Sequence, residues 1–513
     1  MTHRKNILRP LDSEFTDYLR DESRQTGSAQ SISFPLTEED LCEHIRTAAG
    51  ENREITVQGA RTGITAGAVP ERGHIINLSR MTGIKEWHLD NEHEEYSVTV
   101  LPGLTLAELR SEVREQSPGK GPLFFPPDPT ETSASTGGMT ASNASGARSF
   151  YYGPTRKYIR SMRIVLGTGE TLALKRGREK ASGRSFSLKT LEGSDIHGSL
   201  PEYAMPSGKN AAGYFNRPDM DMIDLFIGAE GTLGIISEIE LVLVPSPSSI
   251  WGIMAFFPEE SPAIGFVSSI RKSRPKPAAI EFFDINALKL VEEQRNSNPA
   301  FAELPAVPPG DYTGVYVEYH CAAEEAAEEG AMQMAEIMAE FGGDEDNTWL
   351  ASDEKELLRL KDFRHAVPEA VNLMIDLRKK KEPQLTKLGT DFAVPDEVLT
   401  RMFDVYRRGL SENELEHVIF GHIGDNHVHV NILPRSLEEY RRGRKLCLGW
   451  ARKAAELGGT VSAEHGIGKL KKIFFEQMYS QADIEQMRQI KRLFDPSGIL
   501  NNGNLFTSLD KCE

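Results

Sequence analysis

Residues 57–67 read VQGARTGITAG and follow a short β-rich run at Ile55–Gln58. Their glycines and threonines, with no carboxylate among them, let the backbone approach a ligand closely and direct consecutive N–H groups at an anion. Two similar stretches follow, PPDPTETSASTGGMTASNASGA at residues 126–147 and GAEGTLGIIS at residues 228–237. A surface turn explains any one of them, but three long loops so poor in charge together predict a ligand-binding cradle.

Sequence patterns and composition argue against several functions. Neither a GxxxxGK[ST] phosphate loop nor a clean GxGxxG after the first strand is present, so NTP hydrolysis and NAD on a Rossmann domain lose support. The net charge of -17 repels nucleic-acid phosphates and anionic lipid, which argues against a nucleic-acid role. The four cysteines are scattered without CxxC spacing, so the sequence has no signature of an iron–sulfur cluster, a cysteine zinc site or a disulfide framework.

The sequence indicates a cytoplasmic protein, at most peripheral to the membrane. Its N-terminus has basic residues but lacks the apolar core of a signal peptide. No apolar run reaches the ~18 residues that a membrane span needs. At 513 residues the chain is long enough for several domains, and a homodimer is one assembly open to it.

The three loops resemble, in order and spacing, those of the FAD-linked oxidase family, which shares the vanillyl-alcohol-oxidase fold. The match runs over roughly Phe34–Pro245 and includes YGPTR at residues 152–156 and KNAAGY at residues 209–214. The resemblance implies FAD, with its pyrophosphate held by the first two loops. Family members that bind flavin covalently use a histidine in the first loop, and none lies between Gly59 and Gly67, so we expect non-covalent FAD.

The cofactor-binding residues that the resemblance implies come from the three loops, the segments beside them and one asparagine near the C-terminus. They are Gly59, Ala60, Arg61, Thr62, Gly63, Gly67, Pro127, Thr136, Gly137, Gly138, Thr140, Asn143, Gly146, Tyr152, Gly153, Glu230, Gly231, Gly234, Ile235, Ile236 and Asn501.

Together, pattern and resemblance predict an α+β fold in four parts. Residues 1–32 form a polar lead-in, and residues 33–245 form a two-subdomain FAD-binding domain of the PCMH type. After a Pro/Ser-rich break, residues 246–430 form a ferredoxin-like cap or substrate domain with helices on one side of its sheet. Residues 431–513 form a helical segment that returns to the flavin and completes the active site.

Periodicity places individual elements within this frame. The expected strands of the first domain are Ile55–Gln58, His74–Leu78, Tyr96–Leu101, Ile159–Leu166, Asp224–Ile227 and Ile235–Val244, with helices at Glu38–Ala49 and Thr105–Glu115. The second of these helices opens with a capping box formed by Thr105 and Glu108. Further on we expect strands at Trp251–Phe257, Ala278–Phe283, Thr313–His320 and Val418–Pro434, and helices at Ala263–Lys272, Ala287–Gln294, Ala323–Phe341 and Leu437–Leu457.

A histidine-rich stretch, GHIGDNHVHVN at residues 421–431, is followed by SAEHG at residues 462–466. On an extended strand His427, His429 and Asn431 point to one face. A single buried histidine is most often a hydrogen-bonded core residue, but three within eight residues, with a Glu-His pair nearby, favour a functional site. Two imidazoles and a carboxylate suit a divalent ion, Zn²⁺ most naturally, with a position left open for substrate.

The C-terminal half resembles the FAD-linked oxidase domain of D-lactate and D-2-hydroxyglutarate dehydrogenases and of the glycolate oxidase flavin subunit. The resemblance implies that His422, His429 and Glu464 bind the metal, that Asn431 lies beside the substrate and that His465 is the catalytic base. The chain has Asn426-His427 where these families usually have Gly-Asn. Asparagine tolerates a left-handed turn, but the role of His427 stays open between a metal contact, a substrate contact and a spectator.

The resemblance implies oxidation of a small D-2-hydroxy acid, with D-lactate as the first candidate and then D-2-hydroxyglutarate or glycolate. Arg364, in FRHAVP, matches the family's substrate arginine and would bind the carboxylate as part of the catalytic set, with Lys387 as a second cation. The metal would polarise the hydroxyl, His465 would take its proton, and hydride would pass from C2 to flavin N5. The electrons would leave to an external quinone, cytochrome, electron-transfer flavoprotein or partner subunit.

Two alternatives use the same cradle. One is a flavin-dependent non-redox transferase like the alkyl ether lipid synthases, and the other is a non-catalytic FAD subunit that carries electrons inside a complex. The intact GH…H and EHG motifs favour the dehydrogenase. We expect a transferase to have a different histidine cluster, and a non-catalytic subunit to have lost some of these residues.

Overall fold

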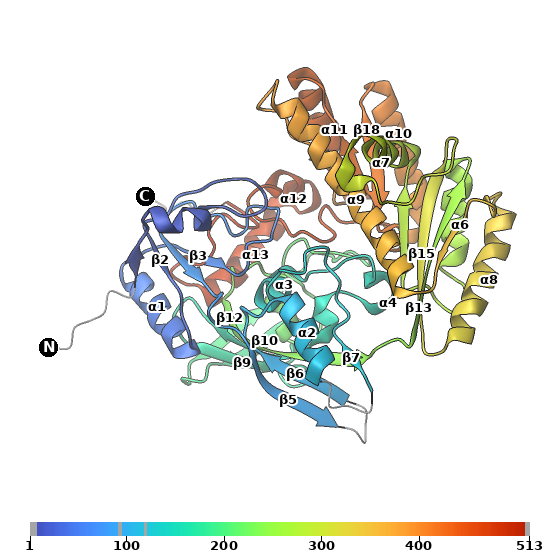
Figure 1. Ribbon diagram of the computed structural model, residues 1–513. Helices are drawn as coiled ribbons and strands as arrows, with labels where there is room; N and C mark the ends of the chain where they lie inside the picture. The colour runs from blue at the N-terminus through green and yellow to red at the C-terminus, as the bar shows by residue number, and fades with distance from the viewer. Residues whose placement is uncertain (1–7, 91–94, 117–120, 508–513) are drawn as a thin grey trace.

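Figure 1 shows the computed structural model of the chain, which describes residues 8–90, 95–116 and 121–507. The chain forms two lobes. The N-terminal half and the last two helices build one lobe, and the segment from about residue 249 to residue 456 builds the other. Within the described ranges no helix is long and apolar enough to cross a membrane.

The first sheet of the N-terminal lobe has four strands in the order β1 (Arg9–Pro10), β2 (Ser31–Ser33), β4 (His74–Asn77) and β3 (Ile55–Gln58). Helix α1 (Glu38–Gly50) begins at a capping box and buries its apolar face against β3 and β4. The C-terminal segment runs parallel to β3, where the N–H of Ile55 donates to the carbonyl of Ile499 at 2.7 Å. The C-terminal segment therefore packs against the sheet of the N-terminal lobe.

His74, in the middle of this sheet, makes stability depend on pH. Its ring is fully buried, with Nδ1 2.8 Å from Ser31 Oγ and Nε2 2.7 Å from Ser33 Oγ. Burial lowers the pKa of His74 from 6.5 to about 3. The unfolded chain protonates His74 more readily than the folded chain does. The free energy of unfolding therefore decreases as the pH falls from about 6.5 toward 3. We expect a change from pH 7 to pH 5 to cost about 2 kcal/mol through this group.

The His74→Asn variant should lose this part of the pH dependence, which urea unfolding midpoints at the two pH values will show. A matched change at the exposed His197, His197→Asn, should keep it. Equal pH dependence in His74→Asn and the unmodified chain would contradict the assignment.

A second, six-stranded sheet carries the second and third cradle loops, whereas the first loop follows β3 of the four-stranded sheet. Its strands run in the order β5 (Ile84–Asp90), β6 (Glu95–Val100), β12 (Ile235–Pro245), β8 (Ile159–Val165) and β9 (Thr171–Lys175), with β7 (Leu123–Phe124) beside β12. Around it lie α2 (Leu106–Gln116), α3 (Thr136–Ser142), α4 (Ser149–Tyr152), α5 (Ile223–Phe226) and the hairpin β10 (Ser185–Lys189) and β11 (Asp195–Ser199). The predicted capping box of α2 is confirmed, because the N–H of Glu108 donates to Thr105 Oγ1 and the Glu108 carboxylate accepts from the N–H of Thr105.

The predicted strand at Asp224–Ile227 is wrong, since Ile223–Phe226 form the short helix α5. All four of its side chains are buried, and a short apolar run buried on every side carries no periodicity that separates strand from helix.

The other lobe is a seven-stranded antiparallel sheet in the order β16 (Trp349–Ala351), β13 (Ser249–Phe257), β15 (Thr313–Cys321), β14 (Ala279–Phe283), β18 (His417–Gly421), β19 (His429–Ile432) and β17 (Leu388–Gly389). Its first four strands have the predicted ferredoxin-like order. The helices, however, do not lie on one side of the sheet. Helices α6 (Glu260–Ile270) and α8 (Glu324–Glu340) cover one face, and α7 (Ile285–Ser297) and α9 (Glu354–Lys379) cover the other (Figure 1).

The apolar run of β13 explains why both faces are covered. Alternate side chains of a strand point to opposite faces, so Ile253 and Phe257 pack in the core with α6 and α8, while Met254 and Phe256 pack with α7 and α9. A strand that is apolar at every position is typical of a sheet buried on both sides.

The expected single strand at Val418–Pro434 is a hairpin of β18 and β19. A 3-10 turn at Ile423–Asp425 separates the two strands, and Asn426 closes it with φ +53° in the left-handed region. Asn426 therefore adopts the left-handed turn conformation that we expected asparagine to tolerate here. The lobe ends with α10 (Leu399–Glu412) and α11 (Leu437–Glu456), after which α12 (Lys472–Met478) and α13 (Gln481–Phe494) return to the first lobe (Figure 1).

Candidate active site

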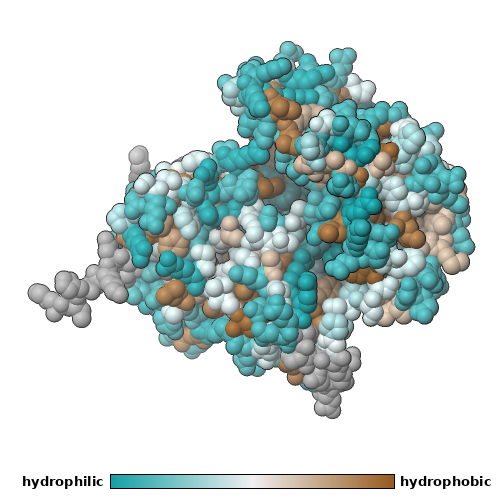
Figure 2. All heavy atoms as spheres, viewed as in Figure 1, coloured by the Kyte–Doolittle hydropathy of each residue, from teal (hydrophilic) through white to brown (hydrophobic). Residues whose placement is uncertain are grey.

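A single cavity of about 1890 Å³ lies between the two lobes, where Figure 2 shows the surface hollowed. Its walls include the cradle loops of one lobe and the histidine-rich hairpin of the other. Pockets for drug-sized ligands hold about 300–1,000 Å³, so this cavity has room for a dinucleotide cofactor beside a small substrate.

The first cradle loop presents unused backbone donors to this cavity. None of the N–H groups of residues 60–67 donates a hydrogen bond to an acceptor in the described chain. A Cβ at Gly63 would meet no atom within 4 Å, so the backbone is open to a ligand there. Consecutive unpaired N–H groups in a glycine-rich loop fit the anionic pyrophosphate of FAD.

The structure places two thirds of the predicted cofactor residues on the wall of the cavity. They are Gly59, Ala60, Arg61, Thr62, Gly63, Gly67, Gly137, Gly138, Glu230, Gly231, Gly234, Ile235, Ile236 and Asn501. The remaining seven do not line the cavity: Pro127, Thr136, Thr140, Asn143, Gly146, Tyr152 and Gly153. Asn143, for example, ends α3 at φ +51° and accepts from the N–H of Arg156 at 3.0 Å, so it shapes the cradle from outside.

Glu230 and Asn501 join the cradle loops to the C-terminal motif. The Glu230 carboxylate accepts from the N–H groups of Ile467 (2.6 Å) and Gly468 (2.8 Å), and burial raises the pKa of this carboxyl group above 4.5. The Asn501 side chain donates to the Glu230 carbonyl at 2.7 Å and accepts from the N–H of Val57 at 2.7 Å. These bonds fix the first loop, the third loop and the turn after His465 to one another.

The histidine-rich hairpin and the EHG turn meet at the cavity. His422, His427, His429 and Glu464 each direct one potential ligand atom into a group whose atoms all lie within 4.8 Å of one another. His422 Nε2 lies 3.3 Å from Glu464 Oε2, and the rings of His427 and His429 are 4.5 Å apart. His429 and Asn431 lie on one strand as expected, but His427 does not, because β19 begins at His429.

His422 and His429 are oriented as metal-binding histidines usually are, with the outward nitrogen held by an acceptor. His429 Nδ1 donates to the carbonyl of Thr390 at 3.0 Å, and His422 Nδ1 lies 2.7 Å from Glu281 Oε1. Burial alone would lower the pKa of His422, but Glu281 and Glu464 outweigh it and raise the pKa to about 10. Burial and the neighbouring imidazoles hold the pKa of His429 well below 6.5.

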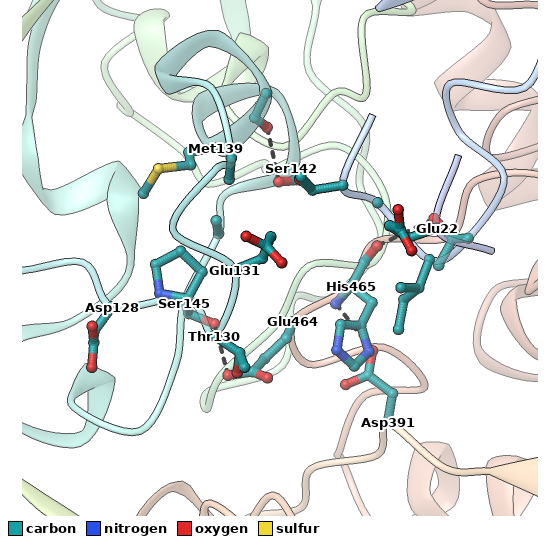
Figure 3. A pocket seen from close by; sticks show the side chains of 18 of the residues that line it. Glu22, Asp128, Thr130, Glu131, Met139, Ser142, Ser145, Asp391, Glu464 and His465 are labelled. Atoms are coloured by element: carbon teal, nitrogen blue, oxygen red, sulfur yellow. Dashed lines mark hydrogen bonds and ion pairs between the residues drawn. The ribbon is translucent and has the colours of Figure 1, made fainter. Parts of the chain in front are cut away.

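Lys209 of the first lobe is the main partner of Glu464. Its Nζ donates to Glu464 Oε1 and lies 3.5 Å from Asp425 Oδ2. Figure 3 shows the second contact of this carboxylate, in which Ser145 Oγ donates to Glu464 Oε1 at 3.3 Å. Burial would raise the pKa of Glu464, but His422 and Lys209 hold it well below 4.5. The sequence placed Lys209 in the KNAAGY motif without assigning it a role.

His465 is held by Asp391, which the sequence analysis missed. The Asp391 Oδ2 atom accepts from the backbone N–H of His465 at 3.1 Å and lies 3.2 Å from its Nδ1 (Figure 3). Ser462 Oγ and Lys471 Nζ donate to the same oxygen at 2.7 and 2.5 Å. Burial would raise the pKa of Asp391, but His465 and Lys471 hold it well below 3.8. His465 itself lines the cavity and is partly exposed. The sequence signal that could have identified Asp391 is a carboxylate directly before the apolar run FAV at residues 392–394.

The predicted substrate residues line the same cavity. Arg364 lies on α9, with Nη2 3.6 Å from Glu281 Oε2 and its guanidinium 5.1 Å from the centre of the Tyr316 ring. Lys387 is exposed, and its Nζ donates to Asn372 Oδ1 at 2.9 Å. Partial desolvation of its ammonium group in the cavity and repulsion by Arg24 lower its pKa. The buried Asn431 donates to the carbonyl of His429 at 3.4 Å.

Fold and site together define a two-lobed flavin-binding oxidoreductase. The chain belongs to the FAD-linked oxidase family: residues 246–505 match the C-terminal domain of FAD linked oxidases, and residues 29–175 match the FAD binding domain. The predicted family, cofactor FAD and α+β fold class are confirmed.

Relatives named as dehydrogenases match nearly the whole chain. It is 28% identical over 499 residues to the D-lactate dehydrogenase of Anaerostipes hadrus, which covers 95% of this chain and 92% of that protein. It is also 28% identical to the D-2-hydroxyglutarate dehydrogenase of Xanthomonas citri pv. viticola, over 98% of this chain and 95% of that protein. The solved 4-ethylphenol oxidase from Gulosibacter chungangensis has the same fold, with a TM-score of 0.66 at 15% identity over 99% of this chain and 95% of that one.

Proposed function

We propose that this protein is an FAD-dependent dehydrogenase that oxidises a D-2-hydroxy acid to the 2-oxo acid. D-Lactate is the first candidate, followed by D-2-hydroxyglutarate and glycolate. One observation carries the proposal: a single cavity is lined by the glycine cradle, by Arg364 and by the cluster that contains Glu464 and His465. The relatives named for D-lactate and D-2-hydroxyglutarate support the substrate class.

Arg364 and Lys387 would bind the substrate. A guanidinium donates two parallel hydrogen bonds to a carboxylate, and a charge-assisted bond contributes about 1.5–3 kcal/mol. The pKa of Arg364 is raised by Glu281, whose attraction outweighs burial, so the cation persists inside the protein. Lys387, on the exposed part of the cavity wall, would take a second acidic group or help to guide the anion in.

His465 would take the hydroxyl proton. Its Nδ1 faces Asp391, which fixes the ring and leaves the other nitrogen for the substrate. Imidazole suits this role because its ordinary pKa lies close to neutral pH. Bound FAD would accept the hydrogen of C2 with its two electrons, which leaves the 2-oxo acid and reduced flavin.

His422, His429 and Glu464 would hold a divalent ion, with Zn²⁺ as the first candidate. Both histidines have an outer acceptor and an inner nitrogen, as metal ligands do. When bound, the ion would supply Lewis-acid stabilisation of the substrate oxygen.

Reduced flavin needs an acceptor from outside this chain. The three cysteines in the described ranges, Cys42, Cys321 and Cys447, are buried and come from separate elements, so they offer no cluster site. A quinone, a cytochrome, an electron-transfer flavoprotein or a partner subunit would serve. We also propose that the FAD is non-covalent, because residues 59–67 contain no histidine.

The test is an anaerobic visible spectrum of the FAD-loaded protein, titrated separately with D-lactate, L-lactate, D-2-hydroxyglutarate and glycolate. We expect one D-acid or glycolate to bleach the flavin band and L-lactate to leave it unchanged. Acid precipitation of the same sample should release the flavin into the supernatant. A flavin band that none of the acids bleaches would contradict the proposed function, and flavin retained in the pellet would contradict non-covalent binding.

A further inference from the structure

His427 is an anomaly within the histidine cluster. Its side chain is completely buried; Nε2 lies 2.8 Å from Asp391 Oδ1, and Nδ1 makes no hydrogen bond to any described residue. Buried polar groups are almost always hydrogen-bonded, and an exception needs an explanation such as a missing ion. A buried imidazole nitrogen without a hydrogen bond, at the edge of a cluster of ligand atoms, indicates that its partner is a bound group.

The direction of the ring identifies the nitrogen concerned. His427 Nδ1 faces the cluster, 4.0 Å from Glu464 Oε2. Its Nε2 lies on the other side, 2.8 Å from Asp391 Oδ1, so the ring is held from outside and Nδ1 is left for a bound group.

The three histidines therefore repeat one arrangement. Each has an oxygen on its outer side: Glu281 at His422, the carbonyl of Thr390 at His429 and Asp391 at His427. Each has its second nitrogen on the side of Glu464. An outer oxygen that holds one nitrogen while the other binds the ion is the usual support of a metal-binding histidine.

We infer that His427 is a fourth protein ligand, so that the ion of the proposed function is held by three imidazoles and one carboxylate. This inference rests on the metal of the proposed function and changes its site. Four protein ligands are typical of structural zinc sites, whereas catalytic zinc sites normally have three.

The test uses the full-length, FAD-loaded protein, stripped with a chelator and reloaded with one equivalent of Zn²⁺. X-ray absorption at the zinc edge counts the bound imidazoles, and competition with a chelating dye measures the zinc dissociation constant. The variants are His427→Asn and, as a matched control, His417→Asn. His417 lies on the same hairpin but outside the cluster, with Nδ1 2.9 Å from the carbonyl of Leu415.

We expect all three imidazoles in the unmodified protein and one fewer in His427→Asn, with zinc affinity at least about tenfold weaker. The His417→Asn variant should match the unmodified protein. A spectrum of the unmodified protein with only two imidazoles would overturn the inference, as would unchanged zinc affinity in a His427→Asn variant that retains its FAD. Failure of the protein to bind zinc would overturn it too, while bleaching of the flavin by a hydroxy acid would still support the oxidation.

Discussion

The His465→Gln variant is expected to lose about a hundred- to ten-thousandfold in the rate of flavin reduction by its hydroxy acid, and to keep its FAD. The loss follows from the position of the ring. Asp391 holds Nδ1 at 3.2 Å, and the residue reaches the cavity that the cradle and Arg364 also line. Glutamine has a similar length but cannot accept a proton at neutral pH. Anaerobic stopped-flow absorbance of the flavin band measures the rate directly.

His365 supplies the control for this variant, because it lines the same cavity but belongs to neither group of metal-ligand atoms. The His365→Gln variant should reduce its flavin at the rate of the unmodified chain. Normal flavin reduction in His465→Gln would show that another group takes the proton. If His465→Gln lost FAD instead, the change would have acted on the cradle, which the hydrogen bond from Thr65 Oγ1 to the carbonyl of His465 touches.

Local signals in the sequence were sufficient for many elements. Helix α1 begins one residue after Thr37 and α2 one residue after Thr105, because each has a capping box that identifies its first turn. Helix α9 was not predicted, although it carries Arg364. Pro368 lies inside its 26 residues, and an internal proline normally indicates a helix end.

The sequence predicted those members of the site that lie close to one another along the chain. His422, His427 and His429 share one hairpin, and Glu464 and His465 are adjacent, so their types and spacing were informative. Their partners come from far away along the chain: Glu281 is 141 residues from His422, and Lys209 is 255 residues from Glu464. Nothing local marks these two residues as members of the site. Only the strand order, which places β14 beside β18, brings Glu281 to His422.

Lys209→Met is expected to destabilise the metal-free protein by about 3–5 kcal/mol, the usual cost of removing one member of a buried ion pair. The Lys209 and Glu464 side chains are only 6% and 8% exposed. Burial alone would lower the pKa of Lys209, but Glu464 and Asp425 raise it above 10.5, so the group is an ammonium ion. Methionine keeps much of the length of the side chain and removes the charge, which leaves His422 as the nearest cation to the Glu464 carboxylate.

A divalent ion bound to Glu464 would supply the charge that Lys209→Met removes. The difference in urea midpoint between the variant and the unmodified protein should therefore be large in chelator and much smaller in saturating Zn²⁺. Lys491→Met is the matched control, since Lys491 Nζ lies 2.7 Å from Asp495 Oδ2 in another buried pair outside the cluster. Its deficit should be the same with and without zinc. If zinc reduced neither deficit, Glu464 would not be a ligand of the ion, and the carboxylate would be neutralised by Lys209 and His422 alone.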